Sequence, residues 1–413
     1  MSVQGMRGEP LLSGGARFAP QPGFFSRLFA PGFGKVLDRV DAGLERGSIT
    51  AHLPDGNTRV LGGRCDGFNA EVWLKDWRAL LRLATNGSVG WFQAYEAGEW
   101  EADCHARLFA VMGDNARTLG NTARSSGAFK RAAQIAHSLN RNDREGSARN
   151  ISAHYDLGND FYGSWLDESM TYSSALGMDE GGLEAAQQRK LAALSERLGN
   201  PRTVLEIGCG WGALAQELAR SGADVTAISL SDEQLHYARA HRSAAIDFRK
   251  QDYRDVDEQF DAIASCEMVE ALGREYWPTF MDCVARNLKP GGRAAIQYIS
   301  MADDLFEDYA GSADFIQAYV FPGGMLIKSS EFRALAEERG LEWRDQVDFG
   351  QDYAATLREW RERFDRALSE GRLPQGFDDR FVRLWRYYLS YCEGGFMAGN
   401  IDVHQVTLVK RGE

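Results

Sequence analysis

Short apolar runs and amphipathic segments alternate between residues 203 and 300. The runs TVLEIGCG, DVTAISLS, FDAIASCEM and RAAIQYIS have the length and composition of buried strands. Between them lie three segments with apolar residues at helical spacing: WGALAQELARSG, SDEQLHYARAHR and YWPTFMDCVARNLKPGG. The first ends at a glycine and the third at Pro-Gly-Gly, both of which are typical helix ends. This alternation predicts an α/β fold with a doubly wound, mostly parallel sheet, in which ligands bind at the carboxyl ends of the strands.

The first third of the chain has a different pattern. GSITAHLPDGNTRVL, from Gly47 to Leu61, places Asp55-Gly56-Asn57 between two alternating stretches, which is typical of a β-hairpin. A strand-like AEVWLKD and a helical WRALLRLATN follow. We therefore predict a flexible N-terminal arm over 1–30, a smaller α+β accessory domain over 31–123, a basic helix and linker over 124–149, and the α/β domain over 150–413.

The predicted linker carries an excess of positive charge. Its basic residues are Arg124, Lys130, Arg131, Arg141, Arg144 and Arg149, and its acidic residues are Asp143 and Glu145. Apolar residues near helical spacing indicate an amphipathic helix. Two interpretations stay open: a solvated helix between domains, which is the commoner case, or a contact with anionic lipid headgroups.

Charge, hydrophobicity and cysteine spacing exclude several classes of protein. The chain of 413 residues has 47 Lys and Arg against 59 Asp and Glu, a net charge of −12, which argues against a nucleic-acid binder. No apolar run reaches the ~18–20 residues of a membrane-spanning helix, and no signal peptide is recognisable, so we expect a cytoplasmic protein. The six cysteines are scattered and predict neither disulfides nor a metal site.

The glycine-rich segment Glu206 to Gly212 follows the first predicted strand of the sheet. Glycines there let backbone amides approach a ligand, and the next helix begins with a field that favours a carboxylate. The third glycine comes too early for a dinucleotide-binding fingerprint. With an acid directly before it, the loop resembles the first motif of S-adenosylmethionine-dependent methyltransferases, whose sheet is Rossmann-like.

Further segments resemble one lipid-modifying family, in order along residues 45–410. They are HYDLGNDFYGSWLDESMTYSSA, VLEIGCGWG, ISLSDEQLHYAR, QDYRD, EMVEALGREYW, FIQAYVFPGG and LWRYYLSYCEGGF. The chain is similar to the cyclopropane-fatty-acyl-phospholipid synthases in their long bacterial form. The resemblance implies an enzyme that transfers the methyl carbon of S-adenosylmethionine to the double bond of an unsaturated phospholipid acyl chain. The product would be a cyclopropane or a methyl-branched unsaturated chain, the latter including precursors of furan fatty acids.

The resemblance also implies site residues. Those matching cofactor-binding positions are Tyr172, Ser173, Glu206, Gly208, Gly210, Trp211, Ser229, Leu230, Gln234, Asp252, Tyr253 and Arg254. Those matching the acyl-chain segment are Phe315, Ile316, Tyr319, Phe321, Gly323 and Gly324.

The catalytic positions depart from the family pattern. Relatives hold a bicarbonate ion as the base, and Glu270, Tyr353, Gln297 and Ser174 match the positions around it. The usual Glu-His pair reads Glu270-Ala271 here, Gln297 stands where a His is expected, and Ser174 stands where a Cys is common. A glutamine can donate an amide hydrogen but cannot become cationic. We therefore expect weaker binding of bicarbonate and an appreciable share of methyl-branched product.

The resemblance implies partners as well. They are phospholipid with unsaturated acyl chains, the inner membrane surface to which the enzyme would attach peripherally, and a second copy of the chain in a homodimer; no nucleic acid is expected. Two other functions are weighed. A catalytically silent lipid-binding protein is disfavoured by the intact Glu206–Gly212 loop. Methylation of a polar small molecule is disfavoured by the lipid-family segments.

Overall fold

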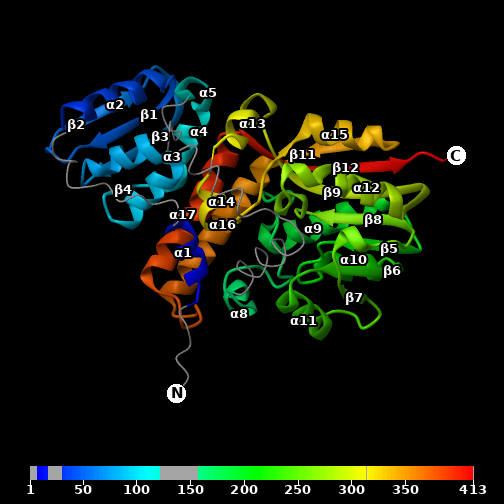
Figure 1. Ribbon diagram of the computed structural model, residues 1–413. Helices are drawn as coiled ribbons and strands as arrows, with labels where there is room; N and C mark the ends of the chain where they lie inside the picture. The colour runs from blue at the N-terminus through cyan, green and yellow to red at the C-terminus, as the bar shows by residue number, and fades with distance from the viewer. Residues whose placement is uncertain (1–6, 17–29, 121–156, 313, 413) are drawn as a thin grey trace. The chain divides into compact units, whose positions relative to one another are not determined.

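The computed structural model describes residues 7–16, 30–120, 157–312 and 314–412 (Figure 1). The predicted basic segment over 124–149 lies outside these residues. The described chain forms two compact units, and each combines distant segments: unit 1 is drawn from 1–140, 304–322 and 375–400, and unit 2 from 141–303, 323–374 and 401–413. The sequence predicted contiguous domains instead, with all residues after 150 in one of them.

Unit 1 contains a four-stranded sheet in the order β2-β1-β3-β4. The predicted hairpin is present: β1 and β2 are antiparallel, and His52 is paired with Thr58 across the turn. Strand β3 is parallel to β1. The elements are α1 (Glu9–Ala16), α2 (Ala30–Gly43), β1 (Arg46–His52), β2 (Thr58–Gly62), β3 (Cys65–Leu74), α3 (Arg78–Glu96), β4 (Trp100–Ala102), α4 (His105–Asp114), α5 (Ala116–Leu119), α14 (Phe315–Tyr319) and α17 (Asp379–Met397). Helix α1 lies within the stretch predicted to be a flexible arm.

Aromatic packing explains why segments after residue 300 belong to unit 1. Phe92 on α3 packs against Phe315 and Tyr319 on α14 and against Tyr387 on α17, with ring centroids 4.6 to 4.9 Å apart. Because burying such rings is strongly favourable, these contacts recruit α14 and α17 into the first unit.

Unit 2 contains the predicted α/β sheet. Its strands run in the order β11-β12-β9-β8-β5-β6-β7, and β10 pairs with β9 (Figure 1). Strands β5 to β9 are parallel to one another, and β12 is antiparallel to both of its neighbours, β9 and β11. The elements are α8 (Asn159–Gly163), α9 (Gly182–Leu198), β5 (Thr203–Ile207), α10 (Ala213–Arg220), β6 (Asp224–Ser229), α11 (Asp232–His241), β7 (Asp247–Lys250), β8 (Phe260–Cys266), α12 (Trp277–Asn287), β9 (Leu288–Met301), β10 (Ile327–Lys328), α15 (Ser329–Glu338), β11 (Leu341–Asp348), α16 (Gly350–Ser369) and β12 (Ile401–Lys410); α13 (Asp303–Ala310) spans the boundary with unit 1.

Alternation along the strands separates the two faces of this sheet. Val204, Val225 and Ala262 share one buried cluster with leucines of α9, α10 and α11. On the opposite face, Tyr298 packs against Phe332 of α15, and Phe332 stacks on Phe280 of α12. The fold class predicted from the sequence is therefore confirmed, with helices on both faces.

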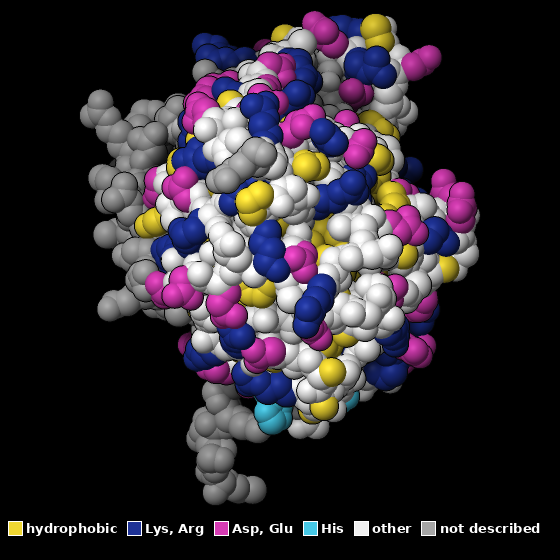
Figure 2. Space-filling view, turned by 90° about the vertical axis from the view of Figure 1, so that its right-hand side faces the viewer, with side chains coloured by type: hydrophobic (Ala, Val, Ile, Leu, Met, Phe, Trp, Pro, Cys, Tyr) yellow, Lys and Arg dark blue, Asp and Glu magenta, His cyan; other side chains and the backbone are white. Residues whose placement is uncertain are grey.

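Charged side chains of both signs are mixed on the surface seen in Figure 2. Many are paired; Arg249, for example, contacts both Asp247 and Glu258. The large hydrophobic residues that are exposed in the described part of the chain are Val60, Trp73 and Val347. Within that part, no helix has both the length and the apolar character needed to cross a membrane.

Candidate active site

The glycine-rich loop joins β5 to α10 at the carboxyl end of the strand. Gly208, Gly210 and Gly212 have φ angles of 84°, 51° and 79°, which an L-residue adopts only at a cost. A Cβ atom at Gly208 would lie 2.5 Å from the Met268 side chain. A Cβ at Gly210 would come no closer than 3.9 Å to another group, the Gln234 amide nitrogen. Position 210 thus faces open space, as a loop that cradles a ligand requires.

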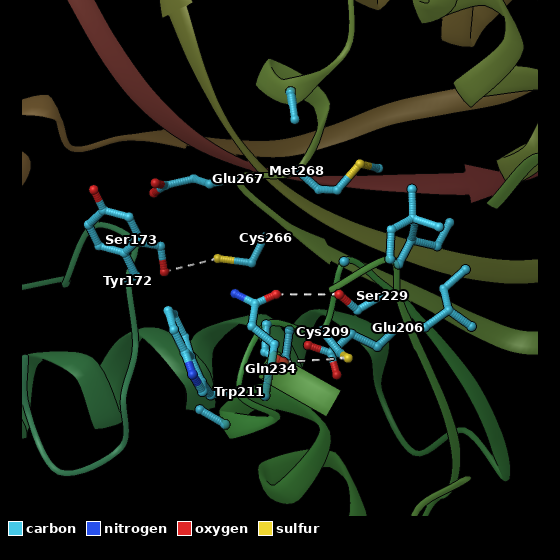
Figure 3. Close-up of a pocket in the computed structure, with 18 of the residues that line it drawn as sticks. Tyr172, Ser173, Glu206, Cys209, Trp211, Ser229, Gln234, Cys266, Glu267 and Met268 are labelled. Carbon is cyan, nitrogen blue, oxygen red and sulfur yellow. Dashed lines mark hydrogen bonds between the residues drawn. The ribbon is translucent and has the colours of Figure 1, made fainter. Parts of the chain in front are cut away.

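One pocket adjoins this loop, and all twelve predicted cofactor-binding residues line it. Figure 3 shows several of them converging on the same space from different elements. The pocket is also lined by residues that the sequence analysis did not name, among them Lys190, Cys266, Glu267 and Met268. The predicted set is therefore brought together, although the role of each residue stays a prediction.

Polar groups line one side of the pocket after β6 and β7. Ser229 donates from its hydroxyl to the side-chain oxygen of Gln234, at 3.3 Å, so that the amide nitrogen of Gln234 is directed into the pocket (Figure 3). Asp252 accepts two side-chain hydrogen bonds from Arg254, at 2.8 and 2.6 Å. The Arg254 guanidinium also lies over the ring of Tyr253. These contacts fix the loop after β7 before any ligand is present.

Aromatic residues form the opposite side. Tyr172 packs among Tyr162, Trp165 and Trp360, with ring centroids 5.3 to 5.6 Å apart. Trp211 donates from its ring nitrogen to the side chain of Asn159 at the start of α8, at 2.7 Å. This cluster holds rigid apolar surfaces at the pocket wall.

Two buried ionisable groups lie at the base of the pocket. Glu206 is 2 % exposed, and one of its carboxyl oxygens has no hydrogen-bond partner. Burial raises the pKa of Glu206 to about 8, against the opposing charges of Lys190 and Arg242. Lys190 is fully buried and donates to the Ser173 hydroxyl at 2.6 Å. An unpartnered buried acceptor beside a glycine-rich loop fits a ligand with an ammonium group, such as the methionine half of S-adenosylmethionine.

A carboxylate that the sequence analysis missed connects the predicted catalytic residues. Glu267 accepts hydrogen bonds from the Tyr353 hydroxyl at 2.7 Å, from the Gln297 side-chain amide at 2.7 Å and from the Ser174 backbone amide at 2.9 Å. Ser174 contributes its backbone here, because its hydroxyl donates to the carbonyl of Ala175. Three of the four predicted catalytic residues thus converge on Glu267.

Glu270, the fourth predicted residue, has a different environment. Its carboxylate accepts from the backbone amide of Ile299 on β9, and its second oxygen is buried without a partner. Burial, and then the nearby charge of Glu267, raise the pKa of Glu270 to about 8. Glu270 does not line the cofactor pocket, whereas Glu267 does. A signal for Glu267 was present in the sequence, since it directly follows the strand FDAIASC.

The predicted acyl-chain residues lie outside the pocket lining. Phe315 and Tyr319 are buried in the aromatic core of unit 1, and Phe321 packs edge-on against Tyr388 in the same unit. Gly323 and Gly324 belong to unit 2. Their contact with a substrate chain stays a prediction, and core packing already accounts for the burial of Phe315 and Tyr319.

One group of described side chains is close enough together to hold a metal ion. Asp348, Asp402 and His404 bring their ligand atoms within 4.8 Å of one another. Both ring nitrogens of His404 are already engaged, with Ser300 and Asp348, and Asp402 accepts from two backbone amides. Hydrogen bonding within the fold therefore explains the group.

The sheet order, the glycine-rich loop and the pocket define an S-adenosylmethionine-dependent methyltransferase. The family model described as mycolic acid cyclopropane synthetase matches residues 142–406. The chain belongs to this family.

Two curated relatives match most of the chain. A tuberculostearic acid methyltransferase of Mycobacterium tuberculosis is 36 % identical over 80 % of this chain and 81 % of its own. The cyclopropane-fatty-acyl-phospholipid synthase of Escherichia coli is 35 % identical over 82 % of this chain and 87 % of its own. The enzyme is thus a C-methyltransferase that methylates or cyclopropanates unsaturated lipid acyl chains.

Solved structures agree with this assignment. The chain is similar to a mycolic acid cyclopropane synthase complexed with S-adenosylhomocysteine and CTAB, with a TM-score of 0.59, 26 % identity, and coverage of 64 % of this chain and 98 % of that one. It is also similar to a cyclopropane synthase from Mycobacterium tuberculosis, with a TM-score of 0.57, 27 % identity and the same coverage.

Replacing Gly210 should weaken ligand binding without unfolding the protein. In Gly210→Ala, the new methyl group meets no close protein atom and enters the pocket. We expect the affinity for S-adenosylhomocysteine to fall at least ~10-fold, which corresponds to ~1.4 kcal/mol, as measured by calorimetry. Gly222→Ala is the matched control, because Gly222 has a φ of 98° and open surroundings but does not line the pocket. Equal affinity in the two variants would show that the loop does not cradle the ligand.

The ligand-free protein should become less stable as the pH rises. A carboxyl group whose pKa is raised to about 8, as in Glu206 and Glu270, keeps a proton in the folded protein that the unfolded chain releases above pH ~4.5. We therefore expect Tm to fall between pH 6 and pH 8. Glu270→Gln should flatten this slope, because a glutamine oxygen still accepts from Ile299 and never ionises. A slope unchanged by the substitution would contradict the buried, protonated state of Glu270.

Proposed function

We propose that the enzyme transfers a methyl group from S-adenosylmethionine to the cis double bond of an acyl chain carried by a phospholipid. The observation that supports this most is the position of Glu267, which lines the cofactor pocket and is held by Tyr353, Gln297 and Ser174. A buried carboxylate beside the methyl-donor site fits chemistry that passes through a carbocation.

Binding and orientation come from the two ends of the pocket. The glycine-rich loop and Glu206 would hold the methionine half of the cofactor, and the Ser229 and Gln234 side would hold the nucleoside half. When bound, S-adenosylmethionine supplies an electrophilic methyl group. Because an alkene is a weak nucleophile, the pocket must align it and exclude water.

The walls near Glu267 suit a developing positive charge. Tyr172 and Tyr353 both pack against Trp360, with ring centroids 5.3 and 6.1 Å apart. Aromatic faces and a carboxylate attract a cation while offering it no water. These residues would prolong the life of the cation until a proton is removed from it.

Two products follow from two positions of proton loss. Loss from the transferred methyl group closes a cyclopropane ring, and a hydride shift with loss from the chain gives a methyl-branched alkene, the class that includes furan fatty acid precursors. The two curated relatives named above are one cyclopropane-fatty-acyl-phospholipid synthase and one tuberculostearic acid methyltransferase. We propose that this enzyme forms an appreciable share of the branched product, because Gln297 cannot become cationic.

Labelling separates the two routes. The purified enzyme is given vesicles of phospholipid with cis-unsaturated chains and a trideuteromethyl donor, and the acyl chains are analysed by mass spectrometry. Ring closure leaves two deuterium atoms on the product, and proton loss from the chain leaves three. We expect both species, with Gln297→His together with Ala271→His shifting the mixture toward the ring.

Product that carries only two deuterium atoms would refute the branched route. Vesicles left unmethylated by enzyme that binds S-adenosylhomocysteine would refute the lipid substrate itself and favour a silent lipid-binding protein. The Gly210→Ala variant serves as the control with weakened cofactor binding in both cases.

The substrate also predicts attachment to a membrane surface. A long acyl chain stays in the bilayer, so the enzyme must reach it there, and basic segments gain ~1 kcal/mol per Lys or Arg near anionic lipids. We expect sedimentation with anionic vesicles that weakens as salt is added. Lys130→Glu with Arg131→Glu should weaken it further. If this variant sediments like the wild type, the basic segment does not contact lipid.

A further inference from the structure

The pocket contains a residue whose position is costly and whose function is unassigned. Glu267 follows the last residue of β8 and has a φ of 49°, in the left-handed region. A non-glycine residue adopts this region only at an energetic cost, and such residues cluster at functional sites. The conformation is held by a hydrogen bond from the Glu267 amide to the carbonyl of Gln297 at 2.8 Å. It directs the carboxylate toward Tyr353 and along the pocket wall.

The donors around this carboxylate are themselves fixed in orientation. Gln297 is fully buried, and its oxygen accepts from the Gln405 amide at 3.0 Å, so that its nitrogen must point toward Glu267. Arg197 in turn donates to the oxygen of Gln405 at 3.1 Å. A chain of directed hydrogen bonds therefore runs from Arg197 through Gln405 and Gln297 to Glu267. It ends on one carboxylate oxygen, and the Tyr353 hydroxyl binds the other.

We propose that Glu267 is the base of the reaction, in place of a bound bicarbonate ion. The inference rests on the proposed function. After the methyl carbon has bonded to one alkene carbon, the neighbouring carbon is a cation. Glu267 takes a proton from the transferred methyl group, and the C–H electron pair closes the ring; alternatively, it takes a proton from the chain, and that pair forms the new double bond. The carboxylate becomes a carboxylic acid and the charges cancel.

The same geometry engages most of the groups predicted to surround bicarbonate. Those groups are Glu270, Tyr353, Gln297 and Ser174, and the last three donate to Glu267 instead. A glutamine at position 297 suits this arrangement, because it supplies a neutral hydrogen bond to a carboxylate that the chain itself provides. Gln297 thus serves as a hydrogen-bond donor to the proposed base, Glu267.

The charge balance near Glu267 is suited to a group that both loses and gains a proton. Burial raises the pKa of Glu267, while the Tyr353 hydrogen bond, the Lys190 charge and the Gln297 hydrogen bond lower it. A base works best when its pKa lies near the working pH. Burial thus favours the protonated form of Glu267, and Lys190 and the two donors favour the ionised form, so that both forms have stabilising surroundings.

Two substitutions at one position test the proposal. Glu267→Gln keeps the shape and removes the base, so turnover on vesicles should fall ~100-fold or more, while the affinity for S-adenosylhomocysteine changes less than ~3-fold. Glu267→Gly tolerates the φ of 49° and leaves an anion-sized space facing three donors. Adding formate or bicarbonate should raise the turnover of Glu267→Gly at least ~10-fold, but should not restore Glu267→Gln, whose amide fills that space.

The matched control is Glu196→Gln, which makes the same charge change at an exposed position near the end of α9. It should keep wild-type turnover. Wild-type turnover in Glu267→Gln would overturn the proposal. Wild-type enzyme that loses turnover in bicarbonate-free buffer and regains it when bicarbonate is returned would overturn it too. A wild-type enzyme that methylates no lipid under any condition would instead refute the proposed function, so the two failures are distinguishable.

Discussion

Burial of charge at the carboxyl edge of the sheet is the constraint on which the site depends. Glu206, Glu267 and Glu270 all lie at this edge, and desolvation raises the pKa of each. Lys190 is fully buried, and its charge opposes that effect at both Glu206 and Glu267. An unpaired buried charge is expensive. The fold therefore supplies hydrogen-bond donors to these carboxyl groups: Tyr353, Gln297 and the Ser174 amide at Glu267, and the Ile299 amide at Glu270.

The three buried carboxyl groups differ in their hydrogen-bond partners. Glu206 keeps one oxygen without a partner, which leaves it ready for an incoming ammonium group. Glu267 has both oxygens engaged by donors that point the carboxylate along the pocket wall. Glu270 is tied to the backbone of β9 and does not line the pocket. Similar burial is thus combined with three different sets of partners, and the proposed roles of the three groups follow from those partners.

Much of the architecture could be predicted from sequence, because it depends on local pattern. The strands β5, β6, β8 and β9, the helices between them and the hairpin of unit 1 follow from apolar periodicity and turn residues. The pocket lining followed from a resemblance, and its residues do come together. Unit 1 could not be predicted completely, because its core joins Phe92 to Phe315 and Tyr387, which are hundreds of residues away in the chain. Periodicity carries no information about such partners.

The candidate base Glu267 was not predicted from the sequence, for a physical reason. The resemblance directed attention to Glu270, whose catalytic role stays a prediction, and made Gln297 a reason to expect weaker binding of bicarbonate. Only the left-handed conformation of Glu267 shows that its carboxylate reaches Tyr353 and Gln297. The amino-acid pattern around a glutamate does not indicate its φ angle. The antiparallel strand β12 was also missed, although its Gln405 orients the amide of Gln297.

The most direct measurement is a crystal structure of the S-adenosylhomocysteine complex grown with bicarbonate at high concentration. The account predicts that the density among Tyr353, Gln297 and the Ser174 amide is the Glu267 carboxylate alone, continuous with its own side chain. A separate small anion bound to those three donors, with Glu267 turned away from them, would contradict it.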